Sequence, residues 1–255
     1  MRRLILVSLA FVFAACSHVA HNSCTPWWRY EPERQNEWPA ACKVGPERSP
    51  VNITTRTEAE YPQISIHYTP FVPRMYNNNR GAKLYADGNG GYVTVTYADG
   101  RSEQFDLQEL HLHRLGEHTF SGTPAPMELH FVNEDRDHNA KVVVTILFDV
   151  TSPSENPGLK EIIPIMPVVS CTYVQGVRIN PMNLLPVGWE SSPYYVYDGA
   201  LTTPDCPGGL KFFILDRRAM TNSDQLARID TVIGRNAKTV AVRELPGIPV
   251  VHPLK

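Results

Sequence analysis

Three histidines in this 255-residue sequence have the types and spacing that could bind a metal ion. His111 and His113 are two residues apart in an alternating segment, so on a strand their side chains project from the same face. His130 lies in a second such segment, with Glu128 two residues earlier, where a carboxylate can accept the ring proton of a ligand histidine. Three imidazoles with an open fourth position are typical of catalytic zinc, although half-exposed strand histidines without a metal give the same pattern.

The segments that would position these histidines are predicted to be β-strands. Polar and apolar residues alternate at 64–68, 92–97, 110–113 and 127–132, and Gly, Pro, Asp or Asn bound each run. Continuous apolar runs at 141–150 and 210–215 predict two strands buried on both faces, which together would form the centre of a sheet. Helical periodicity marks 223–235, after a Ser or Asn cap, and a shorter run at 157–163.

Composition supports a mostly β fold. The 22 prolines and 16 glycines are spread along the whole chain, which suits short elements joined by turns. We expect a single domain over 24–255, built on a large central, mainly antiparallel twisted sheet with short peripheral helices. The formal charge of -2 provides no basic field for nucleic acid, so we expect no nucleic-acid partner.

The N-terminal segment predicts export from the cytoplasm. Arg2 and Arg3 precede an apolar run at 4–15, too short for a membrane span but typical of a secretory signal peptide. Small residues before Cys16 resemble a bacterial lipoprotein cleavage site, so residues 1–15 would be removed, Cys16 lipidated, and 16–23 left as a tether. The alternative is an ordinary signal peptide with Cys16 discarded or free. We expect a periplasmic protein or an outer-membrane-anchored lipoprotein, which contacts the membrane only through this lipid.

Four cysteines remain beyond Cys16, namely Cys24, Cys42, Cys171 and Cys206. An even number in an oxidising compartment predicts two disulfides, but four cysteines allow three pairings and their spacing does not choose among them. A zinc–thiolate site is disfavoured because the chain has no C-x-x-C spacing.

Four blocks of sequence together resemble the α-class carbonic anhydrases of the bacterial type. They are Ser49-Pro50-Val51-Asn52-Ile53, the string LHLHRLGEHT at 110–119, Glu128-Leu129-His130 and Leu201-Thr202-Thr203-Pro204. The family patterns are Q-S-P-x-[ND]-I, H-x-H-x-x-x-E-H-T, E-x-H and L-T-T-P, and the resemblance covers about residues 27–250. It implies reversible hydration of carbon dioxide to bicarbonate and a proton, by attack of a zinc-bound hydroxide.

The resemblance also assigns the central residues of this reaction. His111, His113 and His130 would be the zinc ligands, and three-histidine zinc in this family is known to lower the pKa of bound water to about 7. The Thr202 hydroxyl would donate to Glu117 and therefore accept from the zinc-bound hydroxide, which aims the nucleophile at carbon dioxide.

Supporting residues follow from the same resemblance. His118 matches a position that hydrogen-bonds Glu117, and Glu128 would orient a ligand histidine. Glu109 stands where the family has a glutamine beside the first ligand, and as a carboxylate it would make that imidazole more basic. The pocket for carbon dioxide should be apolar, although each apolar candidate is equally explicable as core; the matching positions are Val132, Val143, Leu201, Leu210 and Thr203.

The resemblance also implies a path for the proton and a pairing of the cysteines. The family's shuttle histidine usually follows Asn-Gly, and the matching residue here is Gly91, after Asn89-Gly90. Tyr30, Asn89 and Thr94 could still order a chain of water molecules. The resemblance pairs Cys42 with Cys206, which leaves Cys24 for Cys171.

Departures from the family keep a second class of function open. Arg48 replaces the glutamine of Q-S-P, and Arg114 follows the second ligand, so both could place charge near the site and slow an enzyme. The alternative is a catalytically weak or silent carbonic-anhydrase-like binding module, but silent relatives typically lack a ligand histidine. Hydrolysis of activated esters is a weaker alternative. The sequence identifies neither the physiological role nor the oligomeric state.

Overall fold

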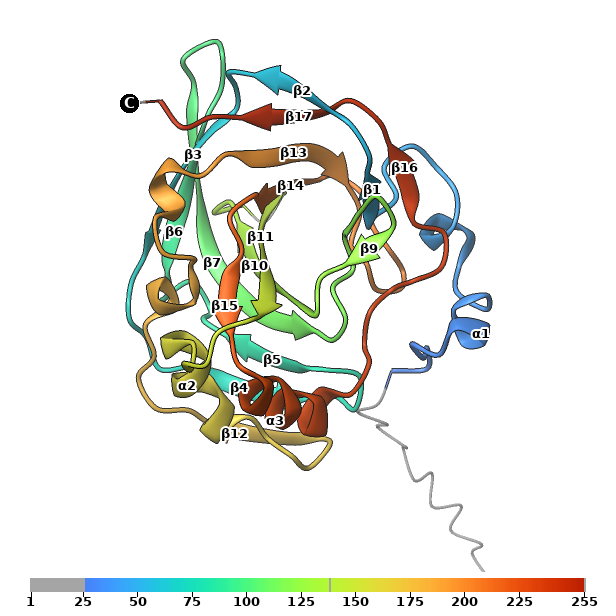
Figure 1. Ribbon diagram of the computed structural model, residues 1–255, viewed down its shortest axis with the longest axis vertical. Helices are drawn as coiled ribbons and strands as arrows, with labels where there is room; N and C mark the ends of the chain where they lie inside the picture. The colour runs from blue at the N-terminus through green and yellow to red at the C-terminus, as the bar shows by residue number, and fades with distance from the viewer. Residues whose placement is uncertain (1–25, 138, 255) are drawn as a thin grey trace, which may run out of the picture.

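The computed structural model describes residues 26–137 and 139–254. Within these residues the chain folds around a twisted sheet of 13 strands, with a second sheet of four strands beside it (Figure 1). The main path of the large sheet runs β12-β4-β5-β7-β10-β11-β14-β13-β17-β2; β6 pairs with β7, β3 with β6, and β15 with β11. The small sheet has the order β16-β1-β8-β9. The expected mostly β fold on a large sheet is confirmed.

The bounds of these elements follow the chain from end to end. The strands are β1 (Val51–Ile53), β2 (Arg56–Ala59), β3 (Gln63–Tyr68), β4 (Arg74–Asn77), β5 (Ala82–Tyr85), β6 (Gly91–Thr96), β7 (Ser102–His113), β8 (Thr119–Phe120), β9 (Thr123–Pro124), β10 (Met127–Glu134), β11 (Lys141–Val150), β12 (Thr172–Gln175), β13 (Tyr194–Gly199), β14 (Leu210–Leu215), β15 (Ala219–Thr221), β16 (Arg243–Leu245) and β17 (Ile248–Val251). The α-helices are α1 (Pro32–Gln35), α2 (Pro157–Ile162) and α3 (Ser223–Ile233), and 3₁₀ turns lie at Ala40–Cys42, Ile163–Ile165, Pro181–Leu184 and Trp189–Ser191.

The centre of the large sheet consists of β7, β10, β11 and β14. β11 and β14 have the same bounds as the two continuous apolar runs and pair with each other in parallel. β17 also pairs in parallel with β2, and β15 with β11, whereas the other pairs of this sheet are antiparallel. The sheet is therefore mixed, but mainly antiparallel as expected.

The two faces of the sheet bury different clusters. Along β10, Leu129 and Phe131 enter the larger apolar cluster, whereas Val132 enters a second cluster on the opposite face. Side chains on a strand alternate between faces, so His130 lies on the face of Val132. Burial of each large apolar side chain contributes about 1.5–3 kcal/mol, so both clusters hold β10 in this orientation.

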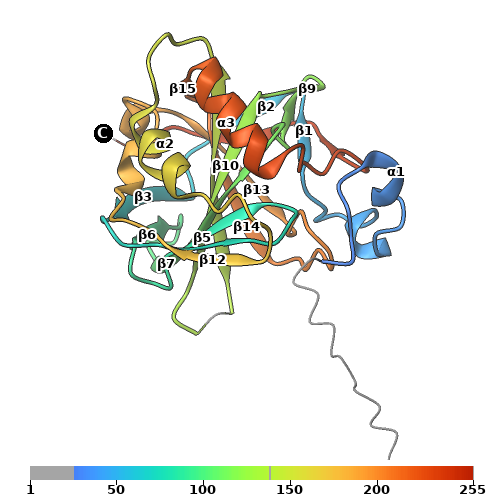
Figure 2. The same ribbon diagram turned by 90° about the horizontal axis from the view of Figure 1, so that it is seen from below.

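Helices α2 and α3 cover the larger cluster, into which Leu159 and Ile229 pack. The side chain of Asn156 caps α2, and that of Asn222 caps α3 by accepting a hydrogen bond from the Gln225 N–H. The helix predicted at 223–235 ends at residue 233 because Gly234 leaves the helical conformation with a φ of 58°. Short helix α1 lies away from α2 and α3, on the side of β1 and β16 (Figures 1 and 2).

A disulfide ties the segment after α1 to the loop after β13. Cys42 and Cys206 are bonded with an S–S distance of 2.08 Å, so the pairing expected from the resemblance is confirmed. Cys171 is also disulfide-bonded, but its predicted partner Cys24 lies outside the described residues. The signal peptide at 1–15, the lipidated Cys16 and the tether at 16–23 lie outside them too. None of the helices in the described part of the chain is long and apolar enough to cross a membrane.

Candidate metal centre

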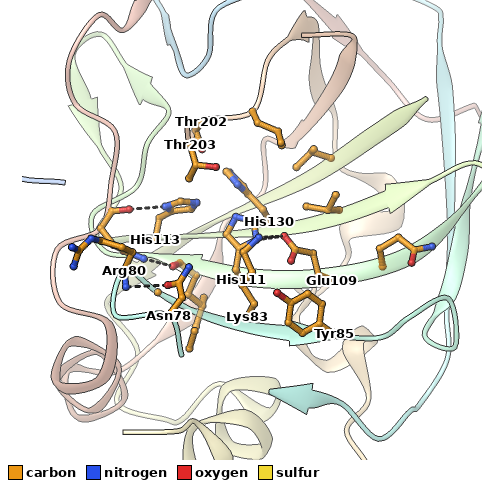
Figure 3. Close-up of a pocket in the computed structure, with 18 of the residues that line it drawn as sticks. Asn78, Arg80, Lys83, Tyr85, Glu109, His111, His113, His130, Thr202 and Thr203 are labelled. Atoms are coloured by element: carbon orange, nitrogen blue, oxygen red, sulfur yellow. Dashed lines mark hydrogen bonds and ion pairs between the residues drawn. The ribbon is translucent and has the colours of Figure 1, made fainter. Parts of the chain in front are cut away.

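The three histidines converge because of the register between β7 and β10. His130 stands directly opposite His111, and Glu128 opposite His113. The ring centroids of His113 and His130 are 4.7 Å apart, and those of His111 lie 5.0 and 5.2 Å from these two rings. One ring nitrogen from each histidine lies within 4.8 Å of the other two. Figure 3 shows the three rings gathered next to Thr202 and Thr203.

Two of the three rings, those of His113 and His130, have one nitrogen hydrogen-bonded to the protein. His113 Nδ1 lies 2.9 Å from the Asn236 carbonyl oxygen, and His130 Nε2 lies 2.5 Å from Glu128 Oε1. His111 Nδ1 is 3.2 Å from Glu109 Oε1, although the angle of this contact is outside hydrogen-bonding geometry. These contacts fix the rings and point the remaining nitrogens at a common centre, as metal-binding histidines require.

The donor set fits a zinc ion. His113 Nε2 is buried without a hydrogen-bond partner, and an unpaired buried nitrogen is costly unless something binds it. Burial lowers the pKa of His111 to about 4 and that of His113 to about 3, so both rings are neutral at pH 7. Neutral imidazole is the form that binds metal, and a three-histidine set is a known zinc site.

A buried network fixes Glu128 behind the metal centre. His118 Nδ1 lies 2.6 Å from Glu128 Oε1, and His118 Nε2 lies 2.6 Å from the Tyr197 hydroxyl. Glu128 Oε2 accepts hydrogen bonds from the backbone N–H groups of Glu117 and His118. Burial acts to raise the pKa of Glu128, but His118 and His130 outweigh it and hold that pKa well below its usual range.

This network corrects the role expected for His118. Both ring nitrogens of His118 are used by Glu128 and Tyr197, so the ring does not hydrogen-bond the Glu117 carboxylate. The physical reason is the turn after β7, which directs the N–H groups of residues 117 and 118 at one oxygen of Glu128. His118 therefore positions Glu128 and, through it, His130.

The Glu117 carboxylate is held by Lys238 and lies next to Thr202. Its Oε1 accepts a 2.8 Å hydrogen bond from the Lys238 N–H, and its Oε2 lies 3.4 Å from His113 Nε2. Burial raises the pKa of Glu117, and the nearby Thr202 hydroxyl acts to lower it. Glu117 Oε2 has no partner at hydrogen-bonding geometry among the described residues. Thr202 thus lies beside the carboxylate with one oxygen of Glu117 available to it.

An ion pair next to the metal centre was not predicted. Lys83 on β5 stands opposite His111, and its Nζ lies 2.8 Å from Glu109 Oε1 (Figure 3). Burial acts to raise the pKa of Glu109, but Lys83 and His111 outweigh it and lower that pKa to about 2. Glu109 therefore lies beside the first histidine as expected, but its charge is largely balanced. No local sequence signal identifies Lys83, because the β5–β7 pairing places it.

A cavity of about 450 Å³ opens at the histidines and has one apolar wall. Val132 and Val143 stand opposite each other on β10 and β11, and Leu201 and Thr203 also line the cavity. Leu210 is not among the lining residues; it packs in the apolar cluster beneath, and Phe212 lines the cavity instead. The period-two pattern from Leu210 could have identified Phe212, which lies on the same face of β14 two residues later.

The expected proton path is wrong at three of its four residues. Tyr30 lines the cavity, but Asn89, Gly91 and Thr94 do not. Arg80, which was not predicted, also lines it. Gly91 pairs with Tyr68 on β3 and has a φ of 85°, and a Cβ there would lie 2.1 Å from the His67 carbonyl oxygen. The Asn-Gly signal therefore belongs to the turn before β6, whereas the β4–β5 turn supplies residues to the cavity.

The two arginines that depart from the family pattern do not line the cavity at the histidines. Arg48 donates to the carbonyl oxygens of Gly45 and Ala241 and does not line the cavity. Arg114 lines a separate cavity. Neither places its charge in the catalytic cavity.

Comparisons with known proteins agree with this geometry. The chain matches the family model described as eukaryotic-type carbonic anhydrase over residues 32–245. It is 26% identical over 232 residues to a carbonic anhydrase of Neisseria gonorrhoeae, which covers 89% of this chain and 88% of that protein. The α-carbonic anhydrase structure of Photobacterium profundum superposes with a TM-score of 0.74 at 26% identity, over 88% of this chain and 100% of that one. That of Thermovibrio ammonificans, complexed with the inhibitor sulfanilamide, gives a TM-score of 0.73 at 27% identity, over 88% and 98%.

Proposed function

The chain belongs to the eukaryotic-type, or α, carbonic anhydrase family, and we propose that it catalyses the zinc-dependent, reversible hydration of carbon dioxide to bicarbonate. Its relatives and structural neighbours are named carbonic anhydrases. One observation carries the proposal: each of three histidine rings brings a nitrogen to within 4.8 Å of the other two, beside an apolar wall, and hydrogen bonds hold two of these rings.

His111, His113 and His130 would hold the zinc ion. When bound, zinc supplies a Lewis acid that makes hydroxide available from water at neutral pH. Asn236 and Glu128 keep the rings of His113 and His130 in the orientation in which their free nitrogens face the centre. A histidine binds a metal ion through its neutral ring, so the charge of the metal would not be compensated by the residues that bind it.

Thr202 and Glu117 would orient the attacking oxygen. The Lys238 N–H fixes one oxygen of Glu117, and the second oxygen would accept a hydrogen bond from the Thr202 hydroxyl, because an ionised carboxylate is an acceptor only. The Thr202 oxygen can then only accept a hydrogen bond from the nucleophile, which turns a lone pair of that nucleophile toward the substrate. Carbon dioxide has no net dipole, and the wall of Val132, Val143 and Leu201 offers it an apolar surface.

The proton produced would leave through water. Among the described residues that line the cavity, the histidines are the three proposed zinc ligands, and a histidine is the usual proton carrier near neutral pH. Burial raises the pKa of Tyr30 well above its usual value, so this hydroxyl can join a hydrogen-bonded chain but does not ionise at neutral pH. Transfer to external buffer is then the slow step.

Metal analysis and a stopped-flow hydration assay test the proposal. The purified chain should contain one zinc per molecule and hydrate carbon dioxide, a chelator should remove both properties, and added zinc should restore them. His130→Ala should lose zinc and activity, because two imidazoles do not complete a tetrahedral site. His67→Ala, which changes an exposed histidine on β3, is the matched control and should keep both. Stoichiometric zinc without hydration would instead indicate the silent binding module.

We also propose that the mature chain is a lipoprotein in the cell envelope. The Cys42–Cys206 disulfide supports an oxidising compartment, and the signal-like residues 1–15 before Cys16 support export. The wild-type chain should fractionate with membranes, and Cys16→Ser should release it into the soluble fraction or leave it unprocessed. An unchanged distribution with the same N-terminal mass would contradict lipidation.

A further inference from the structure

A second cavity lies next to the catalytic one, separated from it by a shared wall. Its volume is about 340 Å³, and Tyr30 and Arg80 line both cavities. Four segments far apart in the sequence meet there: the start of α1, the β4–β5 turn, the chain after β7 and the chain from the end of α3 to Thr239. Nothing in the proposed hydration reaction uses this space.

The walls of the second cavity carry a net positive charge. Arg80, Arg114 and Arg235 line it, against a single lining carboxylate, Glu31, so the formal sum of these four side chains is +2. A cluster of this kind is unusual for a chain with a formal charge of -2. Like charges that lie close together persist where a ligand of opposite charge offsets their repulsion.

Among the described residues, only one of the three arginines pairs with an acidic side chain: Arg114, whose Nε lies 3.4 Å from Asp230 Oδ1. Arg80 donates from Nε to the Trp28 carbonyl oxygen and from NH1 to the Asn79 carbonyl oxygen, each at 2.7 Å, which uses two of its five N–H groups and leaves its charge. Burial and, after it, the neighbouring Arg29 lower the pKa of Arg80, whereas Glu31 acts to raise it. Arg235 is exposed and has no hydrogen-bond or ion-pair partner among the described residues.

Arg114 offers a second, independent sign of a ligand. Its Nε is buried but has no hydrogen-bond partner, although Asp230 Oδ1 lies 3.4 Å away. Its terminal NH1 donates to the Pro126 carbonyl oxygen at 3.0 Å. A guanidinium that still has N–H groups without hydrogen-bond partners can bind an oxyanion, which accepts two parallel N–H bonds from one arginine.

We propose that the second cavity binds a phosphate monoester. A phosphate monoester carries about -1.5 to -2 charges at pH 7, opposite in sign to the lining side chains, whose formal sum is +2, or +1 when Asp230 beside Arg114 is counted. The remaining lining includes the apolar side chains of Leu115, Ile233 and Ala237, which suit the organic part of such an ester. The site is distinct from the metal centre, and its existence does not depend on the proposed hydration of carbon dioxide.

Calorimetric titration of the zinc-loaded chain tests this site. Phenyl phosphate should bind in a saturable 1:1 manner at about 0.15 M ionic strength, where weak surface attraction is screened, and inorganic phosphate should bind less tightly. Benzoate, which has the same ring but a single charge, should bind at least tenfold more weakly than phenyl phosphate. The affinity for phenyl phosphate should persist after the metal is removed with a chelator, because none of the three proposed zinc ligands lines the second cavity.

Charge reversal locates the binding. Arg235→Glu should weaken phenyl phosphate binding at least tenfold, which is about 1.4 kcal/mol. Arg228→Glu makes the same change on the exposed face of α3, outside the cavity lining, and should leave the affinity within twofold of the wild type. Arg235 is exposed, so the variant should keep the wild-type unfolding temperature.

Three results would overturn the proposal. One is the absence of saturable binding up to millimolar phenyl phosphate. Another is an equal loss in Arg235→Glu and Arg228→Glu, which would indicate a general effect of charge. The third is loss of all binding on metal removal, which would assign the anion to the metal centre. Each of these leaves the hydration assay unaffected, so failure here is distinct from failure of the proposed enzyme activity.

Discussion

The Lys83–Glu109 pair makes the pH dependence of this protein a direct test of the site. Glu109 Oε1 lies 2.8 Å from Lys83 Nζ and 3.2 Å from His111 Nδ1. Because the pKa of Glu109 is about 2, its carboxylate is ionised throughout any assay between about pH 5 and 9. Lys83→Met leaves this negative charge unbalanced beside His111, and Glu109→Gln leaves the positive charge of Lys83 instead.

The expected shift follows from Coulomb's law. The charge left on Glu109 or Lys83 would lie roughly 6 Å from the metal centre, because the imidazole ring of His111 stands between them. At an effective dielectric constant of about 20, a unit charge at that distance interacts with a second unit charge by about 2.8 kcal/mol. This energy corresponds to a shift of about two units in the pKa of a group at the metal centre. The Lys83 side chain is 35% exposed and that of Glu109 is 13% exposed, so solvent screening reduces this figure and we expect about one unit. Negative charge opposes loss of a proton at the metal centre. The midpoint of the pH–rate profile should therefore rise in Lys83→Met and fall in Glu109→Gln.

Stopped-flow hydration of carbon dioxide, normalised to zinc content, measures these midpoints. The double variant should return close to the wild-type midpoint, because the two charges disappear together. Lys141→Met is the matched control: Lys141 pairs with Glu134 and lines the same cavity, but neither residue stands opposite His111 in the strand pairing. A fall or no change in the Lys83→Met midpoint, or an equal shift in Lys141→Met, would refute this account of the pair.

Three further predictions address the disulfide, the nucleophile and the proton. Replacing Cys42 and Cys206 by alanine should lower the free energy of unfolding by up to about 5 kcal/mol, because the bridge spans a sequence separation of 164; urea unfolding measures this, and a loss below about 1 kcal/mol would show that the bridge is dispensable. Thr202→Val should reduce kcat/KM on the order of 100-fold with zinc content unchanged, since the Thr202 hydroxyl orients but does not bind the metal; retention of most activity would contradict this role. Turnover of the wild type should rise with imidazole buffer concentration, and Arg80→His, at a residue that lines the cavity, should flatten that dependence; a wild-type rate independent of buffer would show that a residue already carries the proton.

The sequence by itself determined the strands and the faces of the metal site. Alternation with period two at 110–113 and 127–132 predicted the strand segments that β7 and β10 contain, and it placed His111 and His113 on one face. The continuous runs at 141–150 and 210–215 gave β11 and β14 with their correct bounds. These signals are local, because the spacing of side chains along a strand depends only on the backbone of that strand.

Only the tertiary structure decided which strands lie side by side and in which register. Register places His130 opposite His111 and brings Lys83 from β5 to the same histidine. It also separates Gly91 from the cavity, because its strand pairs with β3 and with the far end of β7. A slip of one residue turns every side chain of a strand to the other face, and the pairing that prevents it comes from contacts between segments far apart in the chain. Residues such as Lys83 and the arginines of the second cavity therefore carry no local signal of the site to which they belong.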